Sequence, residues 1–233
     1  MMIRMIEDYK AIIFDLDNTL LDRTQTFHAF ARKLAAKYFS HLTEAQQEEA
    51  IAVIIEKDED GYKDKKALFA ELTDLLPWQE TVQAHELLAF YEEEYVNSAE
   101  LMEGALQLLD WCNNRCKVGL ITNGRHVIQD GKLNRLQIKH YFHSIVISES
   151  AGVKKPNIRI FDLCLEQLEL SPEECVYVGD HPVNDIDGAA KAGLETIWIK
   201  VNQPWRDEIE NKPALTVTSL QQLHDFLEKG QAQ

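Results

Sequence analysis

Asp15 and Asp17 stand two residues apart, directly after the short apolar segment Lys10–Phe14. Side chains two apart along an extended chain point to the same side, so both carboxylates can reach one site. Such a pair can supply a nucleophile and a general acid or base. The run Asp15-Leu16-Asp17-Asn18-Thr19 also suits an ordinary turn, because Asp, Asn and Thr favour turns. Taken alone, this segment leaves both interpretations open.

Two later segments offer groups that could hold an anion. Thr122, Asn123 and Gly124 follow an apolar segment, and their hydroxyl, amide and backbone donors could bind a phosphoryl oxygen. An Asn-Gly pair is equally typical of a plain turn. Lys154 and Lys155 precede a proline and offer a compact cation for a phosphate group. Two solvated surface lysines are the alternative.

A second acidic cluster follows Gly179. Asp180 comes first, Asp185 follows five residues later, and Asp187 is close behind. Carboxylate oxygens gathered in this way suit Mg²⁺, although acids at a helix N-terminus explain the same pattern. We assign Asp187 to that alternative or to a solvated surface. The other two, together with the first aspartate pair, would repel one another without a cation, so the sequence predicts a divalent metal.

The elements that must position these groups are short apolar segments rich in β-branched and aromatic residues. Strands are predicted over Lys10–Phe14, Lys117–Thr122, Ser144–Ser148, Cys175–Gly179 and Thr196–Lys200, with Ala214–Thr218 as a weaker sixth. Helical spacing is seen over Ala105–Cys116, Val127–Leu136 and Ile158–Leu168. This alternation predicts an α/β fold, a parallel sheet with helices on both faces. Ligands of such sheets lie beyond the carboxyl ends of the strands, where the candidate groups fall.

The segment after the first strand has a different pattern. From about residue 24 to 97 the apolar residues repeat at helical spacing, and no good strand is found. We predict four helices inserted into the α/β domain. The predicted division is therefore residues 1–21 and 99–233 for the α/β domain and residues 22–98 for an all-helical domain.

Composition excludes several classes of protein. The 233 residues include 24 Lys or Arg and 39 Asp or Glu, a net charge of −15, which argues against a nucleic-acid polymer as partner. No apolar span of 18 residues exists, so no membrane helix is expected, and Met1–Asp8 lacks the apolar region of a signal peptide. The spacing of the four cysteines predicts reduced thiols and a cytoplasmic location. Oligomeric state is left open.

Four motifs, in this order along the chain, resemble those of the haloacid dehalogenase (HAD) superfamily. Within that superfamily the chain is most similar to subfamily I. The motifs are FDLDNTLLD (14–22), LITNG (120–124), KKPNIRIF (154–161) and VGDHPVNDIDGA (178–189). The resemblance implies a Rossmann-like core with a helical cap of the C1 type. It also implies that Asp15 is the nucleophile of an aspartyl-phosphate mechanism, and that Asp17 is the acid and then the base. Mg²⁺ would bind the Asp15 carboxylate, the Asp17 carbonyl and Asp180, with Asp185 assisting.

In the same resemblance, Thr122 and Lys155 bind phosphoryl oxygens and Asn123 adds an amide. Lys155 is preferred over Lys154 because the lysine of the family directly precedes the proline. Members that cleave carbon–halogen bonds lack an acid at the place of Asp17, so the resemblance implies a hydrolase of phosphoric monoesters. The spacing is most similar to the pyrimidine 5′-nucleotidase branch, which predicts a nucleoside 5′-monophosphate or another small phosphorylated metabolite as substrate. A sugar-phosphate phosphatase, a phosphomutase and a non-catalytic binding protein are the alternatives.

Overall fold

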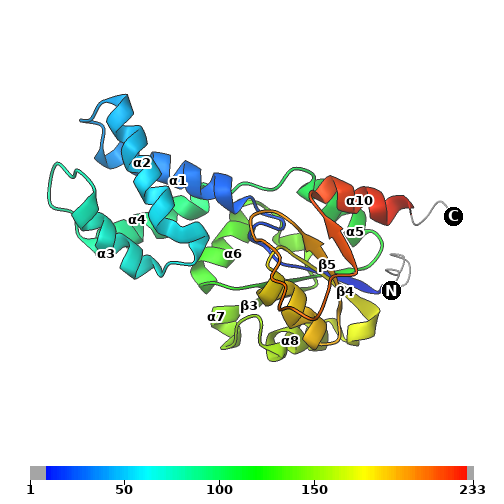
Figure 1. The fold of residues 1–233 in the computed structure, drawn as a ribbon. Helices are drawn as coiled ribbons and strands as arrows, with labels where there is room; N and C mark the ends of the chain where they lie inside the picture. Colours follow the sequence, from blue (N-terminus) through cyan, green and yellow to red (C-terminus); the bar gives the residue numbers. More distant parts are fainter. Residues whose placement is uncertain (1–8, 230–233) are drawn as a thin grey trace. The chain divides into compact units, whose positions relative to one another are not determined.

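The computed structural model describes residues 9–229 (Figure 1). The predicted absence of a signal peptide in Met1–Asp8 falls outside these residues. The chain forms two compact units. The first, here the core unit, joins the residues up to Asp22 to those from Leu101 onward, and the second, here the helical unit, is the continuous segment Arg23–Glu100. The helical unit is thus inserted just after the first strand of the core unit.

Six parallel strands form the sheet of the core unit, in the order β3-β2-β1-β4-β5-β6. The strands are β1 (Ala11–Phe14), β2 (Lys117–Thr122), β3 (Ser144–Ile147), β4 (Cys175–Gly179), β5 (Glu195–Ile199) and β6 (Leu215–Val217). Each agrees with the predicted strand to within one residue at either end. All of β1 and β4 is buried, as expected for central strands covered on both faces. The predicted α/β fold is confirmed.

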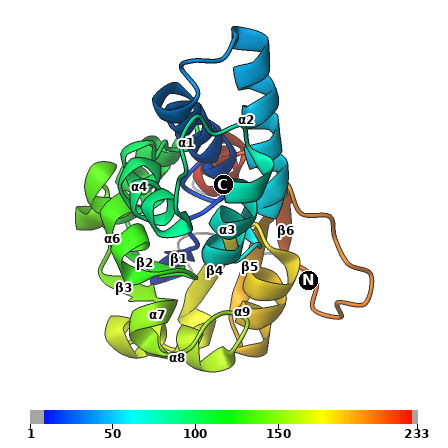
Figure 2. The same ribbon diagram turned by 90° about the vertical axis from the view of Figure 1, so that its left-hand side faces the viewer.

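Helices cover both faces of this sheet (Figures 1 and 2). Helix α8 packs against β2 and β3 and helix α9 against β5, whereas α5 contacts β2 from the other face and α10 packs beside α5. The helical segments of this unit are α5 (Ala105–Asn113), α6 (His126–Arg135), η3 (Lys139–Tyr141), α7 (Ser148–Ala151), α8 (Ile158–Leu168), η4 (Pro172–Glu174), the π-helical turn η5 (Pro182–Asp187), α9 (Gly188–Lys191) and α10 (Leu220–Lys229). The helix predicted over Ala105–Cys116 ends earlier, at Asn113, because the chain must turn before it enters β2.

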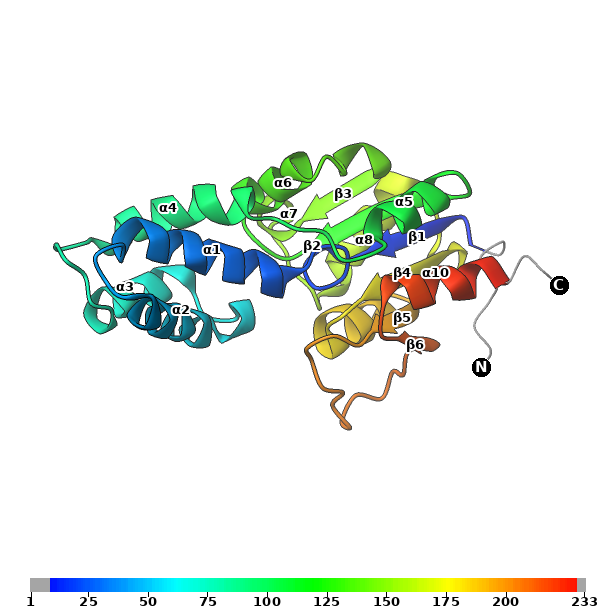
Figure 3. The ribbon, with the colours of Figure 1, turned by 90° about the horizontal axis from the view of Figure 1, so that it is seen from above.

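The helical unit consists of four α-helices (Figure 3), and buried aromatic side chains form its core. The helices are α1 (Arg23–Tyr38), α2 (Glu44–Asp58), α3 (Lys65–Leu75) and α4 (Ala84–Asn97), with a short turn η2 (Glu59–Gly61) after α2. Phe30 is fully buried among five aromatic rings, with centroid distances of 5.3 to 6.4 Å. The four inserted helices agree with the sequence pattern. Within residues 9–229, no helix has both the length and the apolarity needed to cross a membrane.

Candidate active site

The centre of the sheet brings the candidate residues together. From β1 the chain builds the sheet toward β2 and β3, and it then crosses back to place β4 on the opposite side of β1. In open parallel sheets, the crevice beyond the carboxyl ends of the strands at such a switch point is the usual ligand site. Asp15 directly follows β1, and its amide continues the ladder by donating to the Val178 carbonyl of β4 at 2.9 Å. Asp180 directly follows β4.

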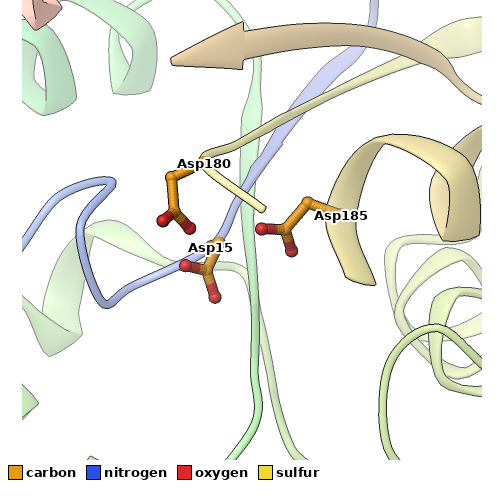
Figure 4. A group of neighbouring side chains, drawn as sticks. All are labelled: Asp15, Asp180 and Asp185. Carbon is orange, nitrogen blue, oxygen red and sulfur yellow. The ribbon is translucent and has the colours of Figure 1, made fainter. Parts of the chain in front are cut away.

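Three buried carboxylates converge at this point. Figure 4 shows the carboxyl groups of Asp15, Asp180 and Asp185 pointing toward one another. One oxygen from each lies within 4.8 Å of the others. Asp185 is on the turn η5, where it accepts a hydrogen bond from the His181 amide at 2.9 Å. A side chain at Gly179 would have its Cβ 2.5 Å from the Asp185 side chain, so glycine leaves the space that Asp185 occupies.

Lys155 lies between two of these carboxylates. Its side chain is buried, and its Nζ lies 2.5 Å from Asp15 Oδ1 and 2.6 Å from Asp185 Oδ1. The ammonium also donates to the Ile121 carbonyl and to the Tyr177 hydroxyl, each at 3.0 Å. A buried ammonium needs such partners, because burying an unpaired charge is costly. Lys155 therefore fixes the nearer oxygens of both aspartates.

Asn123 holds the backbone of Lys155. Its Oδ1 accepts from the Lys155 amide at 2.9 Å, and its Nδ2 donates to the Lys155 carbonyl at 3.1 Å. Both polar atoms of the Asn123 side chain are thereby engaged at the segment that carries the lysine. The sequence suggested a phosphoryl-binding amide at this position, and the structure places that amide against the Lys155 backbone.

Electrostatics at the site favour the binding of a cation. Burial raises the pKa of Asp15 from 3.8 to about 7, with Lys155 opposing the increase and the charge of Asp185 adding to it. Burial also raises the pKa of Asp180 well above its ordinary range, and the charges of Asp185 and Asp15 raise it further. Burial by itself lowers the pKa of Lys155, but the two carboxylates outweigh it and the pKa is raised. One lysine thus does not balance three carboxylates.

The donor set at the site fits a hard divalent cation. Carboxylate oxygens are the ligands that Mg²⁺ and similar ions prefer, and Asp15, Asp180 and Asp185 present them close together. Asp180 is held from its backbone side as well, because the Trp198 indole donates to its carbonyl at 2.7 Å. The buried aspartate cluster could therefore hold a metal ion.

Gln129 of α6 links Asp17 to Thr122, and Lys132 of the same helix pairs with Asp17. The Asp17 carboxylate pairs with Lys132 Nζ at 2.7 Å and accepts from Gln129 Nε2 at 2.8 Å. The same Gln129 amide lies 2.5 Å from the Thr122 hydroxyl oxygen. The Asp17 side chain is thus directed to α6, outside the three-carboxylate cluster.

Comparison with known proteins places the chain in a family. The family model described as haloacid dehalogenase-like hydrolase matches residues 12–199. The chain belongs to this family. The matched region runs from β1 to β5 and includes the three converging aspartates and Lys155. The resemblance stated from the four motifs is confirmed, and the protein is a hydrolase.

Curated relatives and a solved structure are similar to this hydrolase. A glyceraldehyde 3-phosphate phosphatase from Methanothermobacter thermautotrophicus is 31% identical over 94% of this chain and 98% of that protein. The pyrimidine 5′-nucleotidase YjjG from Escherichia coli is 39% identical over 58% of this chain and 62% of its own. The structure of YfnB from Bacillus subtilis, bound to magnesium, has a TM-score of 0.75 at 23% identity and covers 94% of this chain and 98% of its own. The last similarity supports the fold.

The hydrolase also contains site residues that the sequence did not reveal. Gln129, Lys132 and Tyr177 contact predicted site residues, yet none was singled out from the sequence. A signal was present for the first two, because they stand three residues apart and therefore share one helix face. Tyr177 lies within a β-strand segment and looks like any aromatic core residue.

Proposed function

We propose that this hydrolase is a Mg²⁺-dependent phosphatase of small phosphate monoesters that works through an aspartyl-phosphate. The observation that carries the proposal is the convergence of Asp15, Asp180 and Asp185 with Lys155 at the switch point of the sheet. Such a site can hold an anionic phosphate only if cations offset its acids. One relative is named a phosphatase and another a nucleotidase, and both names support the hydrolysis of phosphate monoesters.

In the proposed reaction the Asp15 carboxylate attacks phosphorus, and the bond between phosphorus and the leaving oxygen breaks. Asp17 donates a proton to that oxygen, so the leaving group departs as an alcohol. Asp17, now ionised, takes a proton from a water molecule that attacks the phosphorus of the aspartyl-phosphate. The Asp15–phosphorus bond then breaks, which releases inorganic phosphate and restores both aspartates.

The remaining residues of the site bind and orient. Thr122 and Lys155 are assigned to phosphoryl oxygens, and Asn123 to the support of Lys155. The Asp15 carboxylate, the Asp17 carbonyl and the Asp180 carboxylate would hold Mg²⁺, with Asp185 completing the acidic set. When bound, the ion supplies positive charge that offsets repulsion between these carboxylates and a phosphate dianion.

For the substrate, we propose a nucleoside 5′-monophosphate. The spacing of the motifs supports it, as does the 39% identity to a pyrimidine 5′-nucleotidase over part of the chain. A triose phosphate is the second candidate, because the similarity to the glyceraldehyde 3-phosphate phosphatase extends over 94% of the chain.

We also propose a cytoplasmic location. All four cysteines have free thiols, which supports it.

The test is phosphate release, with and without Mg²⁺, from nucleoside monophosphates, glyceraldehyde 3-phosphate, hexose phosphates and p-nitrophenyl phosphate. We expect turnover that requires the metal and that is abolished in Asp15→Asn, since the amide is not a nucleophile. Asp162→Asn, on helix α8, is the matched control and should retain activity. An Asp15→Asn enzyme with wild-type turnover would contradict the mechanism, and the ranking of substrates decides between the two candidates.

A further inference from the structure

We propose that Gln129 and Lys132 are positioning residues that hold the Asp17 carboxyl in the orientation from which it protonates the leaving group. This inference rests on the phosphatase reaction proposed above and extends it to helix α6, which supplies none of the residues of the four motifs. It concerns groups within the core unit alone.

Both oxygens of the Asp17 carboxylate have a partner on α6. Lys132 Nζ lies 2.7 Å from Oδ1, and Gln129 Nε2 lies 2.8 Å from Oδ2. Lys132 Nζ also donates to Gln129 Oε1 at 2.9 Å, which closes a ring of three side chains. A carboxylate held at both oxygens has one orientation, whereas a single contact would leave its torsion angles free to vary.

The burial of these two residues is difficult to explain by helix packing alone. Gln129 and Lys132 are each 2% exposed, on the face of α6 that points into the core unit. An ammonium in such a place is costly unless it is paired, and an apolar residue would fill the space at lower cost. Lys132 pairs with the Asp17 carboxylate, and Gln129 donates to the same carboxylate. The contact of both buried residues with Asp17 therefore points to a role at the site.

Gln129 also contacts the residue assigned to phosphate binding. Its Nε2 lies 2.5 Å from Thr122 Oγ1, so the two hydrogens of one amide serve Thr122 and Asp17. A hydroxyl that accepts from Gln129 keeps its own proton for another acceptor, which in the proposed reaction is a phosphoryl oxygen. Gln129 thus links the group assigned to phosphate binding to the group that protonates the leaving oxygen.

Gly124 leaves room for this arrangement. Its φ is +146°, and a Cβ there would be 3.0 Å from Gln129 Cγ and 3.1 Å from Cδ. A larger residue at this position would push the amide away from Asp17 and Thr122. The glycine that ends the Thr122-Asn123-Gly124 segment is thereby explained by the placement of Gln129.

The proposed role predicts a dependence on the leaving group. An alkoxide needs a proton as its bond to phosphorus breaks, whereas p-nitrophenolate departs without one. A misplaced Asp17 should therefore slow the cleavage of an alkyl phosphate far more than that of p-nitrophenyl phosphate. A merely structural defect would lower both rates by the same factor.

The experiment compares kcat/KM for these two substrate types in Lys132→Met and Gln129→Leu. The alkyl phosphate is UMP or glyceraldehyde 3-phosphate, whichever the wild-type enzyme hydrolyses faster. We expect kcat/KM to fall about 100-fold for the alkyl phosphate and less than about 5-fold for p-nitrophenyl phosphate, the range that general acid catalysis supplies. Asp17→Asn should give the same split, and adding Lys132→Met to it should cause little further loss.

Arg135→Met removes an exposed cation from the same helix and should leave both rates unchanged. Equal losses on the two substrates in both α6 variants would overturn the inference, as would wild-type kinetics. Gln129→Leu changes no charge, so it provides the test even where Lys132→Met fails to fold. A wild-type enzyme that releases no phosphate from any substrate would instead refute the proposed function, and this inference with it.

Discussion

Lys155 forms ion pairs with two buried carboxylates of the site. Its ammonium meets the carboxylates of Asp15 and Asp185, and both partners are buried with it. Removing one partner of such a buried ion pair lowers the free energy of unfolding by more than the intact pair contributes to it. The reason is that the remaining buried charge is left without a partner. The adjacent Lys154 is exposed, although the two lysines are indistinguishable by type.

Replacing Lys155 should therefore affect both stability and activity. For Lys155→Met without added metal, we expect the free energy of unfolding to fall by about 3–5 kcal/mol, the usual cost of breaking a buried ion pair. Phosphatase activity should be lost as well. Denaturant unfolding and phosphate release measure the two effects, and Lys154→Met is the control that should resemble the wild type. Equal stability of the two variants would show that Lys155 does not compensate the buried carboxylates.

At the scale of elements, the strands and the motif residues could be predicted, because both depend on local sequence. Apolar β-branched runs mark the strands, and the residue after each run stands at the carboxyl edge of the sheet. The contacts of Gln129 and Lys132 could not be predicted in this way. A polar residue on a helix looks the same in sequence whether it faces solvent or a buried carboxylate, and its partner Asp17 is more than one hundred residues away. The engagement of Asn123 with Lys155 was hidden for the same reason.

The helical unit depends on its aromatic core. Phe30 is fully buried and its ring contacts residues from α1, α3 and α4, so its removal would leave a cavity. Phe30→Ala should destabilise this unit by about 3–5 kcal/mol, as for other buried phenylalanines. Hydrogen exchange should then quicken across Arg23–Glu100 and much less in β1 or β4. Phe90→Ala, at a half-buried position, should have a smaller effect, and uniform quickening across both units would contradict a separately packed helical unit.

At the scale of the whole molecule, the acidic site couples folding to pH and to metal binding. The pKa of Asp15 is raised by burial from 3.8 to about 7, and the pKa of Asp180 is raised in the same direction. Between pH 3.8 and about 7, Asp15 of the folded metal-free protein holds a proton that Asp15 of the unfolded chain has released. Asp15 therefore contributes stability that is fully present below pH 3.8 and is lost as the pH rises through about 7.

A divalent cation should reverse this loss, because it binds the ionised carboxylates and stabilises the folded state by mass action. We expect the Tm of the metal-free protein to fall between pH 5 and pH 8, and the increase in Tm on adding Mg²⁺ to grow over the same interval. Thermal unfolding in EDTA and in excess Mg²⁺, at four or five pH values, measures both trends. In Asp15→Asn the position no longer titrates, so the fall in Tm should be smaller and the response to Mg²⁺ weaker at every pH. A Mg²⁺ response that is the same at pH 5 and pH 8 in the wild type would mean that the ion binds away from Asp15, because the raised pKa of that carboxyl, about 7, lies in this interval.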